Sequence, residues 1–301
     1  MKIKMGYDSE DIKKTKFAAY IALAIVVITW GLAPIFGKYM LSSYSPGVKR
    51  LLDVIFATAA LGLIANKQLV EIDKSSVRIL VYIGVLFALA LLFEGIALNY
   101  TTPAKSTFYG NVTCITVPIF VAMFTRKLPS IIKVLSGLIC LLGFGVIVFG
   151  DTIHGGLPSF ALGDGLTLVS GIFYGATVAL TGTYGKKMNS LVLTFFEFCI
   201  SIPVCIFYVL LFENVVFSWK VKDLLIVAVV AIIVQAVCWV LRNFAVRYIE
   251  VSFVAIITSF STIVSGGVSI LVGMDDFSWS LIIGGLICML AVVLSGLSNN
   301  K

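Results

Sequence analysis

Four ionisable side chains lie inside stretches of sequence that are otherwise almost entirely apolar. They are Asp53, Glu94, Glu197 and Arg242, and Lys105 lies near the start of another apolar stretch. A charge held away from water is costly unless it is paired. Such residues are therefore candidates for ion pairs that open and close, or for carboxyls that bind and release protons. The alternative is that they anchor helix ends, with their polar groups reaching water.

The stretches that hold these charges are typical of a membrane protein. Of the 301 residues, 60% are hydrophobic and 12% are charged, which is about half the charge of a soluble domain. Runs of about 20 apolar residues recur along the whole chain, and that length crosses a bilayer as a helix. The net charge of +7 is expected from Lys and Arg in cytoplasmic loops, so no nucleic-acid partner is predicted.

The pattern predicts an all-α polytopic membrane protein with ten transmembrane helices. We expect a cytoplasmic tail over residues 1–16, five spans over 17–149, an outer connecting loop over 150–161, five spans over 162–297 and a cytoplasmic tail over 298–301. Lys and Arg divide 15 to 6 between alternate sides, which places both termini in the cytoplasm. The expected spans are Phe17–Tyr39, Val48–Ala65, Arg78–Tyr100, Pro103–Phe124, Ile131–Phe149, Leu162–Tyr184, Leu191–Phe212, Leu224–Val246, Val251–Val272 and Ser278–Leu297.

The second five spans repeat the first five. A shift of 148 residues aligns the fifth span with the tenth, and a shift of 144 residues aligns the first spans of the two halves. Because each half has an odd number of spans, the halves must cross the membrane in opposite directions. Two inverted five-helix repeats are a design of secondary transporters, which bind substrate near the midplane between the repeats. The aligned pairs include Gly137–Cys140 with Gly285–Cys288, Trp30 with Tyr174, Asp53 with Glu197, and Glu94 with Arg242.

Several short motifs carry a family resemblance. They are Ile28–Gly31, Ala97–Lys105 and Pro118 in the first half, and Ser170–Gly175 and Phe244–Tyr248 in the second. With these motifs the chain resembles the drug/metabolite transporter superfamily, in its ten-helix branch built from two EamA-like repeats, over nearly all of residues 17–297.

The resemblance implies transport of a small metabolite. Members of that family move amino acids, nucleotide sugars, choline, drugs and other small molecules, commonly as exporters. The chain departs from the common family pattern at Lys105 and Arg242. Those departures keep a relative's substrate from being carried over, and an amino acid or amine is the best guess on family grounds alone.

Depth separates the buried charges into two clusters. At 1.5 Å per residue, Glu94 lies roughly 9 Å inside the outer face and Arg242 about as far inside the inner face. Across a core of ~30 Å they are about 12 Å apart along the membrane normal, so a direct bond is not expected. We expect the clusters to gate a central cavity, with Lys105 the nearest partner for Glu94 and Glu197 the nearest for Arg242. The outer cluster contains Lys49, Arg50, Asp53, Glu94 and Lys105, and the inner cluster contains Glu197, Arg242, Arg247 and Glu250.

Aromatic and amide residues are the candidates for binding substrate in that cavity. Gln235 and Trp239 share one face of the eighth span with Arg242. Trp30 and Tyr174 are aligned aromatics near mid-span, which could stack on a substrate or a quaternary ammonium, or could pack in the core.

Polar residues in the fourth and ninth spans complete the prediction. Tyr109 belongs to a polar stripe of the fourth span, and Asn111 is polar and deep, so it needs a partner. The Ser and Thr stripe of the ninth span, which includes Thr258 and Ser261, favours helix packing over cavity lining.

The sequence therefore predicts a secondary transporter that moves a small polar or amphipathic metabolite by alternating access. Its expected partners are the substrate, the lipid bilayer and protons, and its expected location is the cell membrane. No cofactor, metal site or catalytic residue is predicted, because there is no paired histidine, phosphate loop or nucleophile elbow. A channel or uniporter, an intramembrane enzyme acting on lipid head groups, and a scaffold or sensor are the open alternatives.

Overall fold

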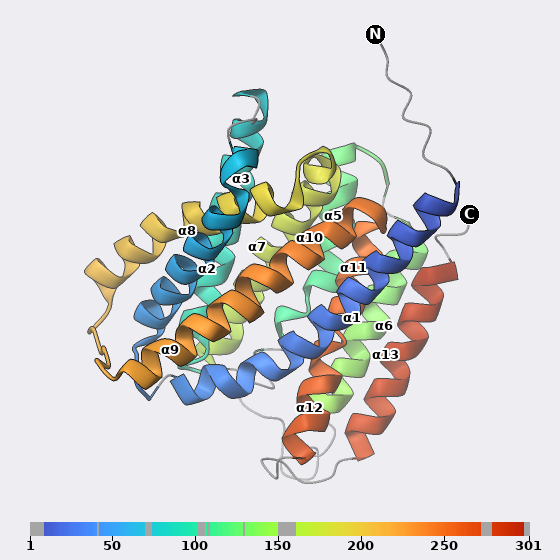
Figure 1. Cartoon of the computed structure of the whole chain (residues 1–301). Helices are drawn as coiled ribbons and strands as arrows, with labels where there is room; N and C mark the ends of the chain where they lie inside the picture. The colour runs from blue at the N-terminus through green and yellow to red at the C-terminus, as the bar shows by residue number, and fades with distance from the viewer. Residues whose placement is uncertain are drawn as a thin grey trace.

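Helices make up nearly all of the part of the chain that the computed structural model describes, which is residues 9–40, 42–69, 74–101, 106, 109–128, 130–149, 161–271 and 279–297 (Figure 1). The first half contains α1 (Ser9–Met40), α2 (Pro46–Leu69), α3 (Lys74–Ala97), α5 (Thr113–Thr125) and α6 (Ile131–Phe149). The second half contains α7 (Leu162–Thr183), η2 (Gly185–Lys187), α8 (Ser190–Phe212), α9 (Val221–Val230), η3 (Ala231–Val237), α10 (Cys238–Tyr248), α11 (Val251–Thr258), α12 (Ser261–Leu271) and α13 (Trp279–Leu297).

These segments correspond to the ten predicted membrane helices, with α9, η3 and α10 forming one continuous helix and α11 with α12 forming another span. Among the described residues, 6 helices are long and apolar enough to cross a membrane, and shorter apolar helices cover 113–125, 131–146 and 282–295. The α2 helix is less apolar at its start because it carries Lys49, Arg50 and Asp53 there. α1 begins at Ser9, so part of the expected tail is helical.

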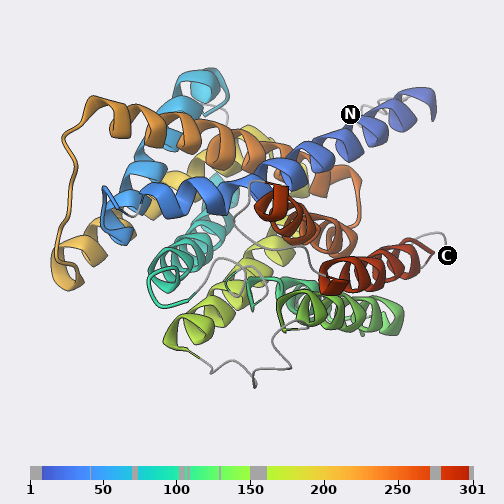
Figure 2. The same cartoon turned by 90° about the horizontal axis from the view of Figure 1, so that it is seen from below.

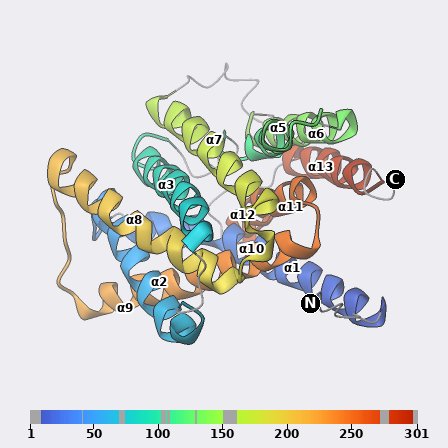
Figure 3. The ribbon, with the colours of Figure 1, turned by 90° about the horizontal axis from the view of Figure 1, so that it is seen from above.

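The two halves pack against each other in a pattern that is unchanged when the halves are exchanged. α2 packs on α8 and α6 packs on α13, and these are counterpart helices. α1 packs on α10 and on α12, while in the exchanged arrangement α7 packs on α3 and on α5. Figures 2 and 3 place the α6–α13 pair together at one edge of the molecule. The packing therefore has the two-fold pseudo-symmetry that the repeat in the sequence predicts.

Two counterpart glycines lie at close approaches between helices. A Cβ at Gly31 of α1 would lie 2.6 Å from Val264 Cβ on α12. A Cβ at Gly175 of α7 would meet Thr116 Oγ1 of α5 and lie 2.8 Å from Thr116 Cβ. Gly175 follows Gly31 by 144 residues, and Val264 follows Thr116 by 148 residues, so both contacts obey the same repeat. Small residues let membrane helices approach closely.

The fourth and ninth spans are broken at counterpart positions, which the sequence did not predict. Asn111 and Val112 form a turn just before α5, and Ser259 and Phe260 form a turn between α11 and α12. Both breaks use the same four backbone hydrogen bonds, starting with Val112 N–H to Tyr109 O at 3.2 Å and its counterpart, Phe260 N–H to Ile257 O at 3.0 Å. Broken helices occur inside membranes only where protein or a wet cavity satisfies the freed backbone groups.

Side chains at the two breaks bind each other across the pseudo-symmetry axis. Asn111 Nδ2 donates to Thr262 Oγ1 at 2.6 Å, and Cys114 Sγ lies 2.8 Å from Ser259 Oγ. A shift of 148 residues turns Asn111 into Ser259 and Cys114 into Thr262. The two contacts are therefore the same contact seen from each half, and they supply the partner that Asn111 needs.

Two loops at one end of the molecule are also joined. Glu213, which follows α8, accepts a hydrogen bond from the Gly47 N–H in the first turn of α2 at 2.8 Å. Tyr44 donates to the carbonyl of Ser218 at 3.2 Å. Burial, and to a lesser extent the charge of Asp223, raise the pKa of Tyr44 above its ordinary value, so its hydroxyl remains a donor. The α1–α2 loop is thereby fastened to the α8–α9 loop.

Candidate functional site

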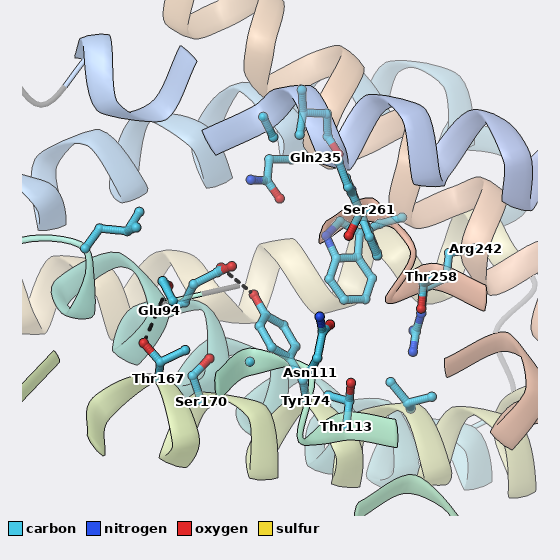
Figure 4. Close-up of a pocket in the computed structure, with 18 of the residues that line it drawn as sticks. Glu94, Asn111, Thr113, Thr167, Ser170, Tyr174, Gln235, Arg242, Thr258 and Ser261 are labelled. Carbon is cyan, nitrogen blue, oxygen red and sulfur yellow. Dashed lines mark hydrogen bonds between the residues drawn. The ribbon is translucent and has the colours of Figure 1, made fainter. Parts of the chain in front are cut away.

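A cavity of about 240 Å³ lies between the two halves (Figure 4). Its walls come from α1, α2, α3, α7, η3 and α10, and from the broken fourth and ninth spans. The lining combines aromatic, hydroxyl, amide and charged side chains. The residues are Trp30, Ala33, Lys49, Arg50, Glu94, Leu98, Ser106, Gly110, Asn111, Thr113, Thr167, Ser170, Tyr174, Val178, Val234, Gln235, Trp239, Arg242, Ala255, Thr258 and Ser261.

An aromatic wall runs along one side of the cavity. The Tyr174 and Trp239 rings are stacked with centroids 5.6 Å apart, and the Trp30 ring lies 5.1 Å from that of Trp239. Trp30 Nε1 donates to the Val234 carbonyl at 3.1 Å. That carbonyl lies in η3, a π-helical segment, and such segments often occur at functional sites. Phe87 packs edge-on behind Trp239 at 4.8 Å, so the wall is backed by a buried ring.

The carboxylate of Glu94 lies at one end of this wall. Its Oε2 accepts from Arg50 Nη2 at 3.1 Å and from the Tyr174 hydroxyl at 3.0 Å, while the Glu94 side chain keeps 40% of its exposure. Arg50 also lies 3.7 Å from Asp53, whose Oδ2 binds Lys49 Nζ at 2.7 Å. The carboxylate is therefore fixed in place by two donors and still faces the cavity.

Gly95 allows the guanidinium of Arg50 to take this position. A Cβ at Gly95 would lie 3.2 Å from Arg50 Nε, so a larger side chain would crowd the guanidinium against α3. In the first half, the buried guanidinium of Arg50 therefore lies between two acids, Asp53 and Glu94.

The guanidinium of Arg242 lies at the other end of the cavity, across Tyr174 from Glu94 in Figure 4. It is 4.9 Å from the centre of the Trp239 ring, and its Nη1 donates to Asn243 Oδ1 at 3.2 Å. Asn243 Nδ2 in turn donates to Glu197 Oε2 at 2.8 Å and to Thr194 Oγ1 at 3.0 Å. The second half therefore bridges an acid and a base with one buried amide.

Most of the residues predicted from sequence to form the site line this cavity. Trp30, Asn111, Tyr174, Gln235 and Trp239 do so, as do Glu94 and Arg242 at its two ends.

Of the other three predicted residues, two are not among the lining residues and one is not described. Tyr109 is not among the lining residues, and its ring lies 6.4 Å from that of Phe149. Glu197 is fully buried and is also not among the lining residues. Lys105 lies outside the described residues, and Glu94 binds Arg50 and Tyr174.

The inner cluster is smaller than the depth argument predicted. Arg242 and Glu197 are joined through Asn243 rather than directly. Arg247 instead donates to the Lys186 carbonyl at 3.2 Å, and Glu250 pairs with Lys133 at 2.8 Å. These two residues therefore have partners other than Glu197 and Arg242.

Sequence reasoning missed several polar residues of the site. Thr258 and Ser261 line the cavity, whereas the sequence favoured helix packing over cavity lining for their stripe. Their counterparts Gly110 and Thr113 line it too, so the repeat itself was the signal. Asn243 could have been found as the polar neighbour of Arg242 in an apolar span.

A duplicated, pseudo-symmetric helical membrane protein with a polar cavity between its halves is a membrane transporter in design. The comparisons agree. The EamA-like transporter family matches residues 17–149 and again residues 161–297, and the chain belongs to that family. The family is one of transporters and not of enzymes.

Two similar proteins extend over nearly the whole chain. An uncharacterized transporter of Archaeoglobus fulgidus is 24% identical over 299 residues, covering 98% of this chain and 90% of that protein. A protein of known crystal structure shares the fold, with a TM-score of 0.75, at 15% identity over 93% of this chain and 98% of that chain.

Proposed function

We propose that this transporter moves a small zwitterionic or amine-bearing metabolite, such as an amino acid, by alternating access. The observation that carries the proposal is the order of groups along the cavity. A partly exposed carboxylate at Glu94 comes first, the Tyr174–Trp239 aromatic wall follows, and the guanidinium of Arg242 comes last.

This order complements the two charges of an amino acid. A substrate ammonium would be held by Glu94 in a charge-assisted hydrogen bond and by the face of an aromatic ring. A substrate carboxylate would bind Arg242, whose planar guanidinium suits carboxylates. The cavity of about 240 Å³ is below the ~300–1,000 Å³ of sites for drug-sized ligands, which favours a metabolite of few atoms.

Alternating access is supported by the pseudo-symmetry of the fold. In inverted-repeat transporters the substrate site is formed near the midplane by discontinuous helices, and one repeat moves against the other. Here both broken spans contribute lining residues at their breaks, Asn111 and Ser261 among them. The charge clusters at Glu94 and Arg242 are proposed as the gates at the two mouths.

The proposed setting is the cell membrane, with both termini in the cytoplasm and export as the direction. The excess of Lys and Arg in one set of loops supports this orientation. Figure 1 is consistent with it, because the start of α1 and the end of α13 lie at the same end of the helix bundle. The direction rests on the family resemblance.

A ligand screen by thermal shift tests the substrate class. A ligand that binds only the folded state stabilises it by about 2.7 kcal/mol at a hundred times its Kd. Amino acids and amines should raise the melting temperature of the purified protein, while sugars and fatty acids should not. Glu94→Gln and Arg242→Gln should each weaken binding roughly 10–100-fold, because each removes one charged hydrogen bond to the ligand.

Two matched variants serve as controls. Glu250→Gln removes an acid that pairs with Lys133 away from the cavity, and Arg247→Gln removes a base one turn beyond Arg242. Both should keep wild-type ligand shifts. The substrate class is wrong if no amino acid or amine stabilises the wild type while another class does, or if the controls lose binding as much as the cavity variants.

A further inference from the structure

Glu197 of α8 is a fully buried acid that the transport cavity does not use directly. Its residue exposure is 0%, and it is not among the residues that line the cavity. Its Oε2 accepts one hydrogen bond from Asn243, while its Oε1 has no hydrogen-bond partner among the described residues. An ionised carboxylate in such a place lacks most of the donors that would replace its water.

The counterpart acid in the first half, Asp53, has different charged neighbours. Asp53 is also fully buried with one unpartnered oxygen, but its Oδ2 lies 2.7 Å from Lys49 Nζ and 3.7 Å from Arg50 Nη1. Two cations therefore neutralise Asp53 where it stands. Among the described residues, the side chain of Glu197 accepts a hydrogen bond from Asn243 alone, and Arg242 reaches it through that amide.

The charged surroundings of Glu197 are few in the described part of the chain. α8 packs against α2, α3 and α10. The guanidinium of Arg242 on α10 reaches Glu197 through the amide of Asn243 and acts on it electrostatically. Several other charged residues on or next to these elements are engaged elsewhere: Lys49, Arg50, Asp53 and Glu94 with each other, Glu213 with the first turn of α2, and Arg247 with the Lys186 carbonyl. Arg78 near the start of α3 is exposed.

We propose that Glu197 is a proton-binding site, coupled to the transport cavity through Asn243 and Arg242. The proton binds the free carboxylate oxygen and is exchanged with water in the cavity, so the group alternates between a carboxylate and a neutral carboxylic acid. While Glu197 is ionised, its negative charge attracts the guanidinium of Arg242. Once Glu197 is protonated, that attraction is lost and the guanidinium can bind an anionic group in the cavity.

This coupling, which rests on the proposed function, has a definite sign. A substrate carboxylate on Arg242 offsets the positive charge that favours ionised Glu197. Substrate binding therefore favours proton binding, and by linkage the proton favours substrate binding by the same factor. A substrate that carries a carboxylate should bind with uptake of a proton and bind more tightly as the pH falls.

Infrared difference spectra of the protein in lipid vesicles, recorded between pairs of pH values, test the site without any substrate. The C=O stretch of a protonated carboxyl is separate from the amide bands. Wild-type protein should gain such a band as the pH is lowered. Glu197→Gln should lose most of it, while the matched variant Asp53→Asn should keep it. An unchanged band in Glu197→Gln, or loss of the band in Asp53→Asn alone, would overturn the proposal.

A second variant guards against misfolding of the first. Arg242→Gln removes the positive charge nearest Glu197, so the carboxyl should hold its proton to higher pH. The midpoint of the band should rise by about one pH unit, the effect of a unit charge at ~10 Å with an effective dielectric of ~20. A midpoint that stays or falls contradicts the proposal. If the wild type shows the band but binds no amino acid or amine, the proposed substrate alone is refuted.

Discussion

The paired glycines allow a prediction whose size follows from the packing. In Gly31→Ala the new Cβ would lie 2.6 Å from Val264 Cβ and 2.9 Å from the Ser261 carbonyl oxygen. Carbon atoms in contact normally lie about 3.5–4.0 Å apart, so α1 and α12 would have to separate by roughly 1 Å. Rotating a side chain cannot relieve the clash, because Cβ positions are fixed by the backbone.

The magnitude is the difference between two effects. Overpacking typically costs about 1–3 kcal/mol, while replacing Gly by Ala inside a helix returns up to about 1 kcal/mol. Gly31→Ala should therefore lower the free energy of unfolding by about 1–2 kcal/mol. At about 2–4 °C per kcal/mol, the melting temperature of the purified protein should fall by roughly 2–8 °C.

Gly267 on α12 is the matched control, because a Cβ there would have nothing within 4 Å. Gly267→Ala should leave the melting temperature unchanged or raise it slightly. Melting is followed for both variants in the same detergent, together with binding of the ligand found by the thermal-shift screen. The reasoning fails if Gly31→Ala melts like Gly267→Ala, since the close approach of α1 and α12 would then not exist.

Three further predictions address the site and its supports. Tyr174→Phe removes the hydroxyl that donates to Glu94 at 3.0 Å. Binding of an amine should weaken about 3–10-fold in titrations. Wild-type affinity in this variant would contradict a role of Tyr174 in positioning the Glu94 carboxylate. Glu213→Gln weakens the acceptor at the first turn of α2; amide hydrogen exchange there should quicken about 5-fold, as expected for a lost cap of ~1 kcal/mol, and unchanged exchange would count against the loop contact. Asn111→Ala removes the hydrogen bond to Thr262. The free energy of unfolding should fall by about 0.6 kcal/mol, and by at most ~1.7 kcal/mol, the range for such bonds in membranes. A much larger loss in thermal unfolding would point to an unrecognised role of the break.

The repeat made much of this fold predictable from sequence. The odd number of spans in each half fixed their opposite directions, and the two shifts paired Trp30 with Tyr174 and Glu94 with Arg242. All four of these residues line the cavity. Pseudo-symmetry explains this success, because residues related by the repeat must lie at related positions around one axis.

The partners of the charges were less predictable. Spacing along a span gives depth, but the packing of neighbouring helices decides which face meets which. Arg50 pairs with Glu94 because α2 packs beside α3 and Gly95 leaves room for its guanidinium. Asn243 similarly comes between Glu197 and Arg242.

The two helix breaks were also not predicted from the sequence. Glycine and proline are the residues that usually interrupt a helix; Gly110 directly precedes the first break, but Ser259–Phe260 at the second contains neither. Contacts between the halves accompany both breaks, including the bond from Asn111 to Thr262. Such contacts become apparent only when the two spans are placed face to face.

Counterflow into liposomes tests the central claim most directly. Purified protein is reconstituted with an unlabelled amino acid or amine inside, and uptake of the same labelled compound is followed over time. The wild type should accumulate label transiently above equilibrium, and Glu94→Gln and Arg242→Gln should reduce the initial rate at least 10-fold at equal protein content. Uptake no greater than in protein-free liposomes across the panel, or near wild-type rates in both variants, would contradict the account.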